Sequence, residues 1–491
     1  MTAAIDPCFR QTDTLPDVWK PLLKWRRKHG FDPFLSERRF GCGLSPVVAP
    51  PQSVDQILVS LGRPDPVERR FPIETFPAFF DRLKLRRQYG NIRLAAAGTP
   101  IEVQARVELQ AIAARARDSQ IKWLLQHMLR RTWTKNGFRE RLSFFWGDHF
   151  TALGKTGAGS RGMSTYIESA IRPNIAGRFG DLLVAAVTNP IMLQYLDQNF
   201  SVGPNSMDAR QSTGQSRGLN ENLAREVLEL HTLGVDGPYT QTDVSELARL
   251  FTGLTFSFEK GFIFKSSFSE PGTKTVLGVA FGGAGAGTLN DVKALLHMLA
   301  LHPATARHLS EKLATHFLGD GYPSDLADQM AARYLETGGY LLEVYRTMLS
   351  HPSAWDKDRG KAKNPFDFVS SAMRALAISP KIASEFPTKK IQMTLMHPMA
   401  LMGQPWEEPT GPDGWSEASE AWITPQGLAA RLQWGMAIPQ VFCPELPDAD
   451  SFAAAALGPE VAPSLRTIVA GAENKWSGIG LVLASPEFQT M

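Results

Sequence analysis

The segment from Asn220 to Gly253 constrains the fold most strongly, because it carries the start and stop signals of two successive helices. Asn220 can cap a helix N-terminus, and Gly234 suits the left-handed position that follows a helix. A second start follows where Thr240 and Asp243 have the spacing of a capping box, and Gly253 ends that helix. The pattern therefore predicts a helical hairpin over these residues.

The first of these helices, residues 220–233, has an apolar side and a polar stripe. At about 100° per residue, Asn222, Glu226 and Glu229 fall on one face. Arg225 lies beside them, whereas Leu230 and His231 point to the opposite, apolar side. Two carboxylates one turn apart repel each other, so the pKa of one rises unless a cation lies between them. Arg225, a basic group of another helix or a hard divalent cation could supply that charge, and a solvated helix face remains the alternative.

Apolar residues recur with helical spacing through most of the chain. Residues 103–134 are predicted to form a long helix, and a second helix over 138–150 carries Asp148 and His149 near its end. The one clear β pattern is an alternating stretch near residues 255–265, which predicts a small β-hairpin. The expected fold class is therefore mainly α, with many helices.

We find no domain linker, so residues 31–491 are predicted to form one large helical domain. Residues 1–30 are expected to be an N-terminal extension, whose basic run at 24–29 is typical of a solvated helix face. Two loops are predicted inside the domain, a flexible polar loop at 201–218 and a loop rich in proline, glycine and tryptophan at 403–422. Long loops of this kind often serve as lids or binding loops.

The charge balance argues against several classes of function. The chain has 52 Lys and Arg residues against 49 Asp and Glu residues, a net charge of +3. Binding to nucleic acid or to an anionic membrane is not expected, because both need clustered basic charge. The three cysteines form no C-x-x-C pair, which argues against a cysteine zinc site.

The sequence also carries no sign of a membrane protein. It has no apolar run of about 18 residues, so no membrane span is expected. The first residues lack the apolar core of a secretory signal. A cytoplasmic location is therefore expected, with export without a recognisable leader as the alternative.

The chain resembles a known family. The run GLNENLAREVLELHTLGV at 218–235 is similar to the signature of the bacterial domain-of-unknown-function family 1800. Further matches follow the run and are spread along the chain: Tyr239-Thr240, Asp243-Val244, Ala248-Arg249, Thr252-Gly253, Arg38–Gly43, Phe145–Phe150, Tyr195–Asp197, Lys274–Gly278, His302-Pro303, Lys363–Phe366, Gly403–Pro405 and Ser485–Phe488. The resemblance covers nearly everything from Phe31 onward.

The resemblance implies no established activity. It does imply a partner, because members of this family are often found with a sulfatase-like or alkaline-phosphatase-like protein. One departure concerns a His-Asp pair that the family often has before its Lys-x-x-Leu-Gly stretch. This chain has Ser266 to Pro271 in that place, and the pair is missing.

Two hypotheses for the function follow from these patterns. The first is a polar or metal-binding pocket between the helices at 138–150 and 220–233, with hydrolase-like activity and a partner protein. The catalytic candidates are His149, Glu226 and Glu229, which are also the candidate ligands of a divalent cation, and the ligand-binding candidates are Asn222, Arg225 and Asp148. The second hypothesis is a non-enzymatic assembly or accessory protein, in which the polar stripe is a buried structural ion-pair network.

Overall fold

The computed structural model describes residues 31–155, 157–211, 218–357 and 360–491. The predicted N-terminal extension at 1–30, with its basic run, lies outside these residues. The described chain is mainly helical, which confirms the predicted fold class. Within the described ranges, none of the helices has both the length and the apolar character that crossing a bilayer requires.

Short capped helices open the described part of the chain. The side chains of Asp32, Ser53 and Asp65 each accept a hydrogen bond from a backbone N–H of the helix that follows, which satisfies donors that a helix start leaves unpaired. These helices are α2 (Pro33–Arg39), α3 (Val54–Leu61) and α4 (Pro66–Arg70).

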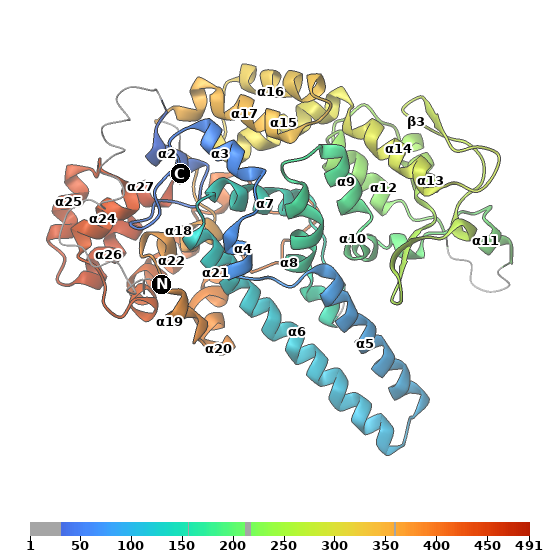
Figure 1. The fold of residues 1–491 in the computed structure, drawn as a ribbon, viewed down its shortest axis with the longest axis horizontal. Helices are drawn as coiled ribbons and strands as arrows, with labels where there is room; N and C mark the ends of the chain where they lie inside the picture. The colour runs from blue at the N-terminus through green and yellow to red at the C-terminus, as the bar shows by residue number, and fades with distance from the viewer. Residues whose placement is uncertain (1–30, 156, 212–217, 358–359) are drawn as a thin grey trace.

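Two long helices project from the body of the protein as an antiparallel pair (Figure 1). They are α5 (Phe76–Ala95) and α6 (Pro100–Trp133), and each has a proline in its first turn, where no backbone N–H is needed. The buried residues of α6 gather towards its C-terminal end. The free end of this helical pair is therefore largely exposed.

Helix α6 takes part in two hydrophobic cores. Its Trp123 belongs to the larger core, which contains residues from Phe31 to Ala354. Its Leu124 and Met128 belong to the second core, which is built mainly from the C-terminal helices. The buried end of α6 therefore lies where the two cores meet.

The helices of the larger core come from the middle of the chain. They include α7 (Gly137–His149), α8 (Met163–Tyr166), η4 (Ile167–Ile171), α9 (Phe179–Val187), α10 (Pro190–Tyr195), α14 (Leu289–Ala300), α15 (Pro303–Leu318), α16 (Ser324–Glu336), α17 (Leu341–Ser350) and η9 (Pro352–Trp355). The short helices η3 (Gly157–Arg161), η5 (Arg172–Asn174) and η6 (Gln198–Phe200) connect elements of this region. Figure 1 shows α15, α16 and α17 together along one edge of the molecule.

The C-terminal helices cluster at the opposite end from α13 and α14 (Figure 1). They are α18 (Pro365–Ala375), α19 (Pro380–Ser384), α20 (Thr388–Ile391), η10 (Gln392–Met396), α21 (His397–Leu401), η11 (Ser419–Ala421), α22 (Pro425–Ala437), α23 (Pro439–Phe442), α24 (Ala449–Leu457), α25 (Pro463–Ala470), α26 (Lys475–Ala484) and α27 (Pro486–Gln489). Helix α18 packs against α6 and so joins this cluster to the rest.

The predicted helical hairpin is present. Its first arm is α12 (Asn222–Glu226), which continues directly into the π-helix η7 (Val227–Thr232). Its second arm, α13 (Gln241–Phe251), packs against α12. The predicted capping box is also present, since Thr240 and Asp243 bond each other's backbone N–H groups.

The change of pitch in the first arm alters which side chains are buried. Asn220 was predicted as the N-cap, but Glu221 holds that position and Asn220 precedes it; the Asn220 side-chain oxygen still accepts a hydrogen bond from the N–H of Asn222 (2.8 Å). A π-helix has more residues per turn than an α-helix, so faces assigned at about 100° per residue shift progressively after Glu226, although Val227, Leu228 and His231 are still buried as predicted. Leu230, predicted on the apolar side, is only half-buried, whereas Thr232 is fully buried.

The predicted β-hairpin is present too. Strands β1 (Leu254–Ser257) and β2 (Gly261–Phe264) pair antiparallel. A second hairpin, β3 (Lys274–Val276) with β4 (Val279–Phe281), is not among the sequence predictions. Its strands have three residues each, too few for a repeating alternation to stand out.

The two predicted loops have different contents. The loop at 201–218 contains the short helix α11 (Met207–Gln211), and its residues 212–217 lie outside the described part. Glu270, in the stretch that lacks the His-Asp pair, holds the start of this loop by accepting two hydrogen bonds from Asn205 (2.8 and 2.6 Å). The loop at 403–422 is confirmed as largely non-helical, with η11 near its end.

Candidate functional site

The predicted polar stripe lies at the surface of the first hairpin arm. The guanidinium of Arg225 bridges Glu221 (3.5 Å) and Glu229 (3.3 Å), and the Arg225 side chain is 40% exposed. Asn222 is exposed and Glu226 is half-buried. Arg225 therefore pairs with Glu229, one of the two predicted carboxylates, and with Glu221 in place of Glu226, and the stripe is not the buried network of the second hypothesis.

His149 lies on the other side of this helix, away from solvent. Its Nε2–H donates to the carbonyl of His231 (3.3 Å), and Nε2–H of His308 donates to the carbonyl of Leu230 (3.2 Å). Both carbonyls belong to η7, so the two histidines satisfy backbone acceptors near a helix end. Burial holds the pKa of His149 well below its usual range, with Lys312 adding to the effect, so its imidazole is neutral.

The structure thus brings His149 and His231 together, although the sequence pattern separates them. Their ring centroids are 6.0 Å apart, and burial lowers the pKa of His231 to about 3. Among the described residues, Nδ1 of each ring lacks a hydrogen-bond partner. The catalytic and metal-binding roles of His149, Glu226 and Glu229 stay predictions. In the same part of the chain, no three His, Cys, Asp or Glu side chains form a group that could hold a metal ion.

Asp148, the neighbour of His149, turns towards the loop at 403–422. Its two carboxylate oxygens accept hydrogen bonds from the N–H of Trp415 (3.0 and 3.1 Å). Gly414 makes this contact possible, because a Cβ there would lie 2.6 Å from the carboxyl carbon and its φ is +81°. Burial raises the pKa of Asp148 well above its usual range, and the carboxylate of Glu417 raises it further.

The same loop links Asp148 to the polar stripe. Burial and Glu229 raise the pKa of Glu226, and Asp413 of the loop adds to this effect. Asp413 also contributes to the raised pKa of Asp148. The ammonium group of Lys312, on α15, lowers the pKa of Asp148. Burial in turn lowers the pKa of Lys312, and the Asp148 carboxylate raises the pKa of Lys312. Two of the predicted residues, Asp148 and Glu226, therefore share one electrostatic environment.

Asp148 lines an internal cavity of about 50 Å³, which we call the aromatic cavity. One water molecule needs about 10–15 Å³ on this measure, so the cavity holds a few waters. Its apolar walls are Phe144, Met163, Ile167, Phe366, Met399, Pro405, Trp406 and Trp415, and its polar lining is His127, Arg131, Glu140, Ser143, Asp148, Gln404 and Glu407. The surface that these residues present to the cavity is mainly apolar, with polar groups set into it, which is typical of ligand sites.

A second buried carboxyl group, Glu407, lines this cavity. It accepts hydrogen bonds from the hydroxyl of Ser164 and from Nε2 of Gln120 (3.1 Å). Burial raises the pKa of Glu407 to about 7 in spite of these bonds. Its backbone is left-handed, with φ of +57°, which is a strained conformation for a residue other than glycine.

His127 stands beside Glu407 at the same wall. Its Nε2 lies 3.3 Å from the Ser164 hydroxyl, and its ring is 5.3 Å from that of Trp406. Burial lowers the pKa of His127 to about 3, so the imidazole is neutral. His127, Ser164 and Glu407 therefore form a chain of polar contacts that reaches the cavity.

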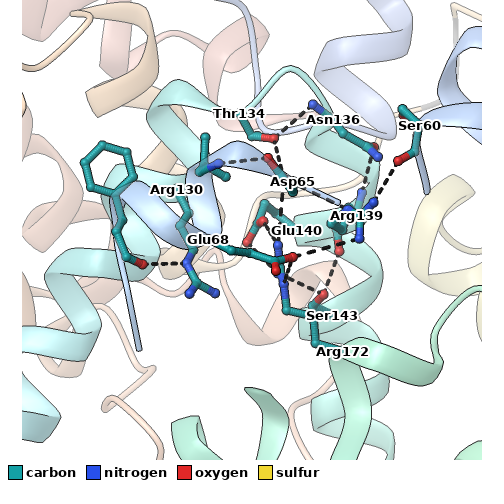
Figure 2. A network of polar contacts seen from close by, with 12 residues as sticks. Ser60, Asp65, Glu68, Arg130, Thr134, Asn136, Arg139, Glu140, Ser143 and Arg172 are labelled. Carbon is teal, nitrogen blue, oxygen red and sulfur yellow. Dashed lines mark hydrogen bonds and ion pairs between the residues drawn. The ribbon is translucent and has the colours of Figure 1, made fainter. Parts of the chain in front are cut away.

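An ion-pair network supports another wall of the aromatic cavity (Figure 2). Arg172 donates to both carboxylate oxygens of Glu140 (2.6 and 3.2 Å) and to Glu68 (2.9 Å). Burial alone would raise the pKa of Glu140, but Arg172 holds it down, to about 2. Arg139 donates to three backbone carbonyls, including that of Ser60 (2.7 Å). Glu140 is therefore a permanent charge, unlike Asp148 and Glu407.

Sequence reasoning did not find Glu407, His127 or Lys312. His127 lies inside a long helix whose apolar spacing indicates only packing against the core, and Lys312 has no neighbouring motif. A weak signal did exist for Glu407, because the loop at 403–422 was marked by its composition and the matched run Gly403–Pro405 directly precedes Trp406 and Glu407.

Comparison with known proteins gives one match. A family model described as "Protein of unknown function (DUF1800)" matches residues 38–490. No curated protein and no solved structure has a significant match to the chain. The matched region covers well over half of the chain and confirms the resemblance of its central motif. The chain therefore belongs to the DUF1800 family.

Proposed function

We propose that this chain is a hydrolase-like enzyme in which Asp148 and Glu407 transfer protons at the aromatic cavity. The observation that carries the proposal is that both carboxyl groups line the same cavity and both have raised pKa values. A carboxyl group that stays protonated near neutral pH can act as a general acid, which an ordinary surface carboxylate cannot. Shifted groups in a cavity are typical of catalytic sites.

The proposed step is the cleavage of a polar bond by water. Protonated Asp148 gives its proton to the leaving-group oxygen, and ionised Glu407 takes a proton from the attacking water. The pKa of about 7 gives Glu407 a large ionised fraction at neutral pH. The protons balance, because water loses one and the leaving group gains one. A second exchange with bulk water restores both carboxyl groups.

The lining supplies a binding group for the substrate. The buried Nε1–H of Trp406 lacks a hydrogen-bond partner among the described residues, and a substrate oxygen would provide one. The cavity is too small for more than a few waters. A larger substrate therefore requires movement of the loop at 403–422, which carries Trp406, Glu407 and Trp415.

The proposal retains part of the first hypothesis. Asp148 keeps a functional role, now as the acid, and Glu407 takes the place expected for Glu226 and Glu229. A divalent cation at those residues and a sulfatase-like or alkaline-phosphatase-like partner protein stay predictions. The proposed proton transfer requires neither of them.

Titration of the protein tests the proposal without knowledge of the substrate. In protein labelled with ¹³C at aspartate carboxyl groups, one signal should titrate well above the usual aspartate pKa of about 4 and should be missing in Asp148→Asn. A spectrum in which every aspartate titrates near the usual value would refute the proposal.

An activity screen then tests the chemistry. Wild type, Asp148→Asn and Asp181→Asn are each assayed with chromogenic esters, phosphate esters, sulfate esters and glycosides. Asp148→Asn should lose about 100-fold or more of any activity found. The matched control is Asp181→Asn, because Asp181 is an exposed aspartate on α9. Activity that survives in Asp148→Asn at the level of the control would exclude Asp148 as the acid.

A further inference from the structure

A wide groove lies along the projecting helical pair, where the pair faces α10 and the β1–β2 hairpin. Its volume is about 690 Å³, which is within the usual range of ligand pockets. Residues of α5, α6, α10 and β1 line it, together with Phe258 in the β1–β2 turn. We call it the arginine groove, because Arg86, Arg87, Arg93 and Arg106 all line it and no Asp or Glu does.

The basic charge of the chain is concentrated beside this groove. Residues 76–133, which contain α5 and α6, carry eleven Lys and Arg residues against four Asp and Glu residues. Arg82, Arg130 and Arg131 pair with Glu74, Glu168 and Asp367 outside this segment, which leaves a local net charge of +4 in a chain whose total is +3. The balanced total therefore hides a basic cluster, so the argument from net charge alone does not hold for this part of the molecule.

Most of the guanidinium groups of the groove have no internal carboxylate. Arg106 pairs with Glu102 (2.6 Å), one turn away on α6. Within the described ranges, Arg86, Arg87 and Arg93 form no ion pair. Three arginines on one concave surface repel each other, and an anionic ligand would relieve that repulsion.

Aliphatic side chains share the groove with the arginines. Leu83, Leu94 and Leu109 line it, and Leu94 is 70% exposed. Ile101 and Val103, at the start of α6, are 60% and 62% exposed. Exposed apolar side chains next to a charged rim are typical of surfaces that bind a protein segment.

The aromatic residues of the groove argue against other anionic polymers. Phe80 and Phe258 stack on each other, with centroids 5.5 Å apart, and the guanidinium of Arg87 covers the ring of Phe258 at 4.8 Å. A groove that binds single-stranded nucleic acid needs open aromatic faces for stacking. A membrane surface needs a convex contact, whereas this site is hollow.

We propose that the arginine groove binds an acidic, leucine-containing peptide segment of a partner protein. The carboxylates of the segment would pair with Arg86 and Arg93, and its aliphatic side chains would pack on Leu83 and Leu94. This inference is independent of the chemistry proposed at the aromatic cavity, because the two sites share no lining residue.

Fluorescence anisotropy of the full chain with a short labelled peptide of alternating glutamate and leucine tests the proposal. The wild type should bind this probe, and the affinity should fall as salt is raised. The double variant Arg86→Gln/Arg93→Gln should bind about tenfold more weakly. The matched control, Arg115→Gln/Arg117→Gln, removes the same charge from exposed positions of α6 that do not line the groove, and it should bind like wild type.

Three outcomes would overturn the proposal. The first is an absence of binding, and the second is an equal loss of affinity in both double variants, which would indicate general charge attraction. The third is tighter binding to single-stranded DNA or to vesicles that contain phosphatidylserine than to the peptide. Circular dichroism of each variant establishes that the helices are intact, since both pairs of substitutions lie on helices.

Discussion

Replacing Glu407 by glutamine tests the charge state of the aromatic cavity through the stability of the protein. The side chain is 7% exposed and accepts hydrogen bonds from Ser164 and Gln120. Glutamine has nearly the same shape, and it keeps both contacts when its oxygen accepts from Gln120 and its NH2 donates to the Ser164 hydroxyl, but it cannot ionise. Glu407→Gln therefore removes the ionisation of this carboxyl group and leaves the packing of the side chain nearly unchanged.

The magnitude follows from the shift of the pKa. Burial raises the pKa of Glu407 from 4.5 to about 7, which corresponds to about 3 kcal/mol. Because the folded-state pKa is raised, the stabilising contribution is fully present below pH 4.5. It falls as the pH rises towards about 7 and is lost above that value, since unfolding then lets the carboxyl group ionise in water.

The measurement is urea denaturation of wild type and Glu407→Gln at several pH values between about 4.5 and 8. The free energy of unfolding of the variant should gain about 3 kcal/mol relative to wild type over that range. Glu408→Gln is the control, because Glu408 is the exposed neighbour and the substitution makes the same chemical change outside the cavity. A difference between wild type and Glu407→Gln that is constant with pH would show that this carboxyl group has an ordinary pKa.

Two further substitutions test the surroundings of the cavity. Arg172→Met leaves the buried Glu140 carboxylate unpaired and should lower the free energy of unfolding by about 3–5 kcal/mol, much of which Glu140→Gln should restore in the double variant. Gly414→Ala should cost about 1–2 kcal/mol for its left-handed backbone and should also push Asp148 away from Trp415, seen as a changed Asp148 titration. Gly403→Ala is the control, because its φ is +102° and its added Cβ meets open space; an equal effect on Asp148 in both variants would contradict the steric argument.

The helical hairpin could be predicted because its signals are local. The capping box of Thr240 and Asp243 depends on residues three positions apart and occurs as expected, and Asn220 bonds the first turn of the other arm from one position before the N-cap. The π-helix at Val227–Thr232 could not be predicted in this way, because a periodic pattern assumes one pitch throughout. As a result, Leu230 was predicted on the buried apolar side, whereas the structure shows it only half-buried.

The aromatic cavity could not be predicted, because its walls are distant in sequence. Gln120 and His127 of α6 meet Ser164 of α8 and Glu407 of a loop, with separations of up to 287 residues. The local pattern of a single segment does not predict contacts between residues so far apart in the sequence. Asp148 was identified as a candidate, but its environment depends on Trp415, which the sequence alone does not bring near it.

Helix α6 connects the two proposed sites directly. One unbroken helix of 34 residues carries Arg106 at the arginine groove and His127 at the aromatic cavity, about 30 Å apart along its axis. A rigid rod cannot move at one end without moving at the other, so a tilt of about 5° that shifts the outer end by about 3 Å must turn the buried end by the same angle. The inner end of that rod lies between both hydrophobic cores, where side chains have little room to yield.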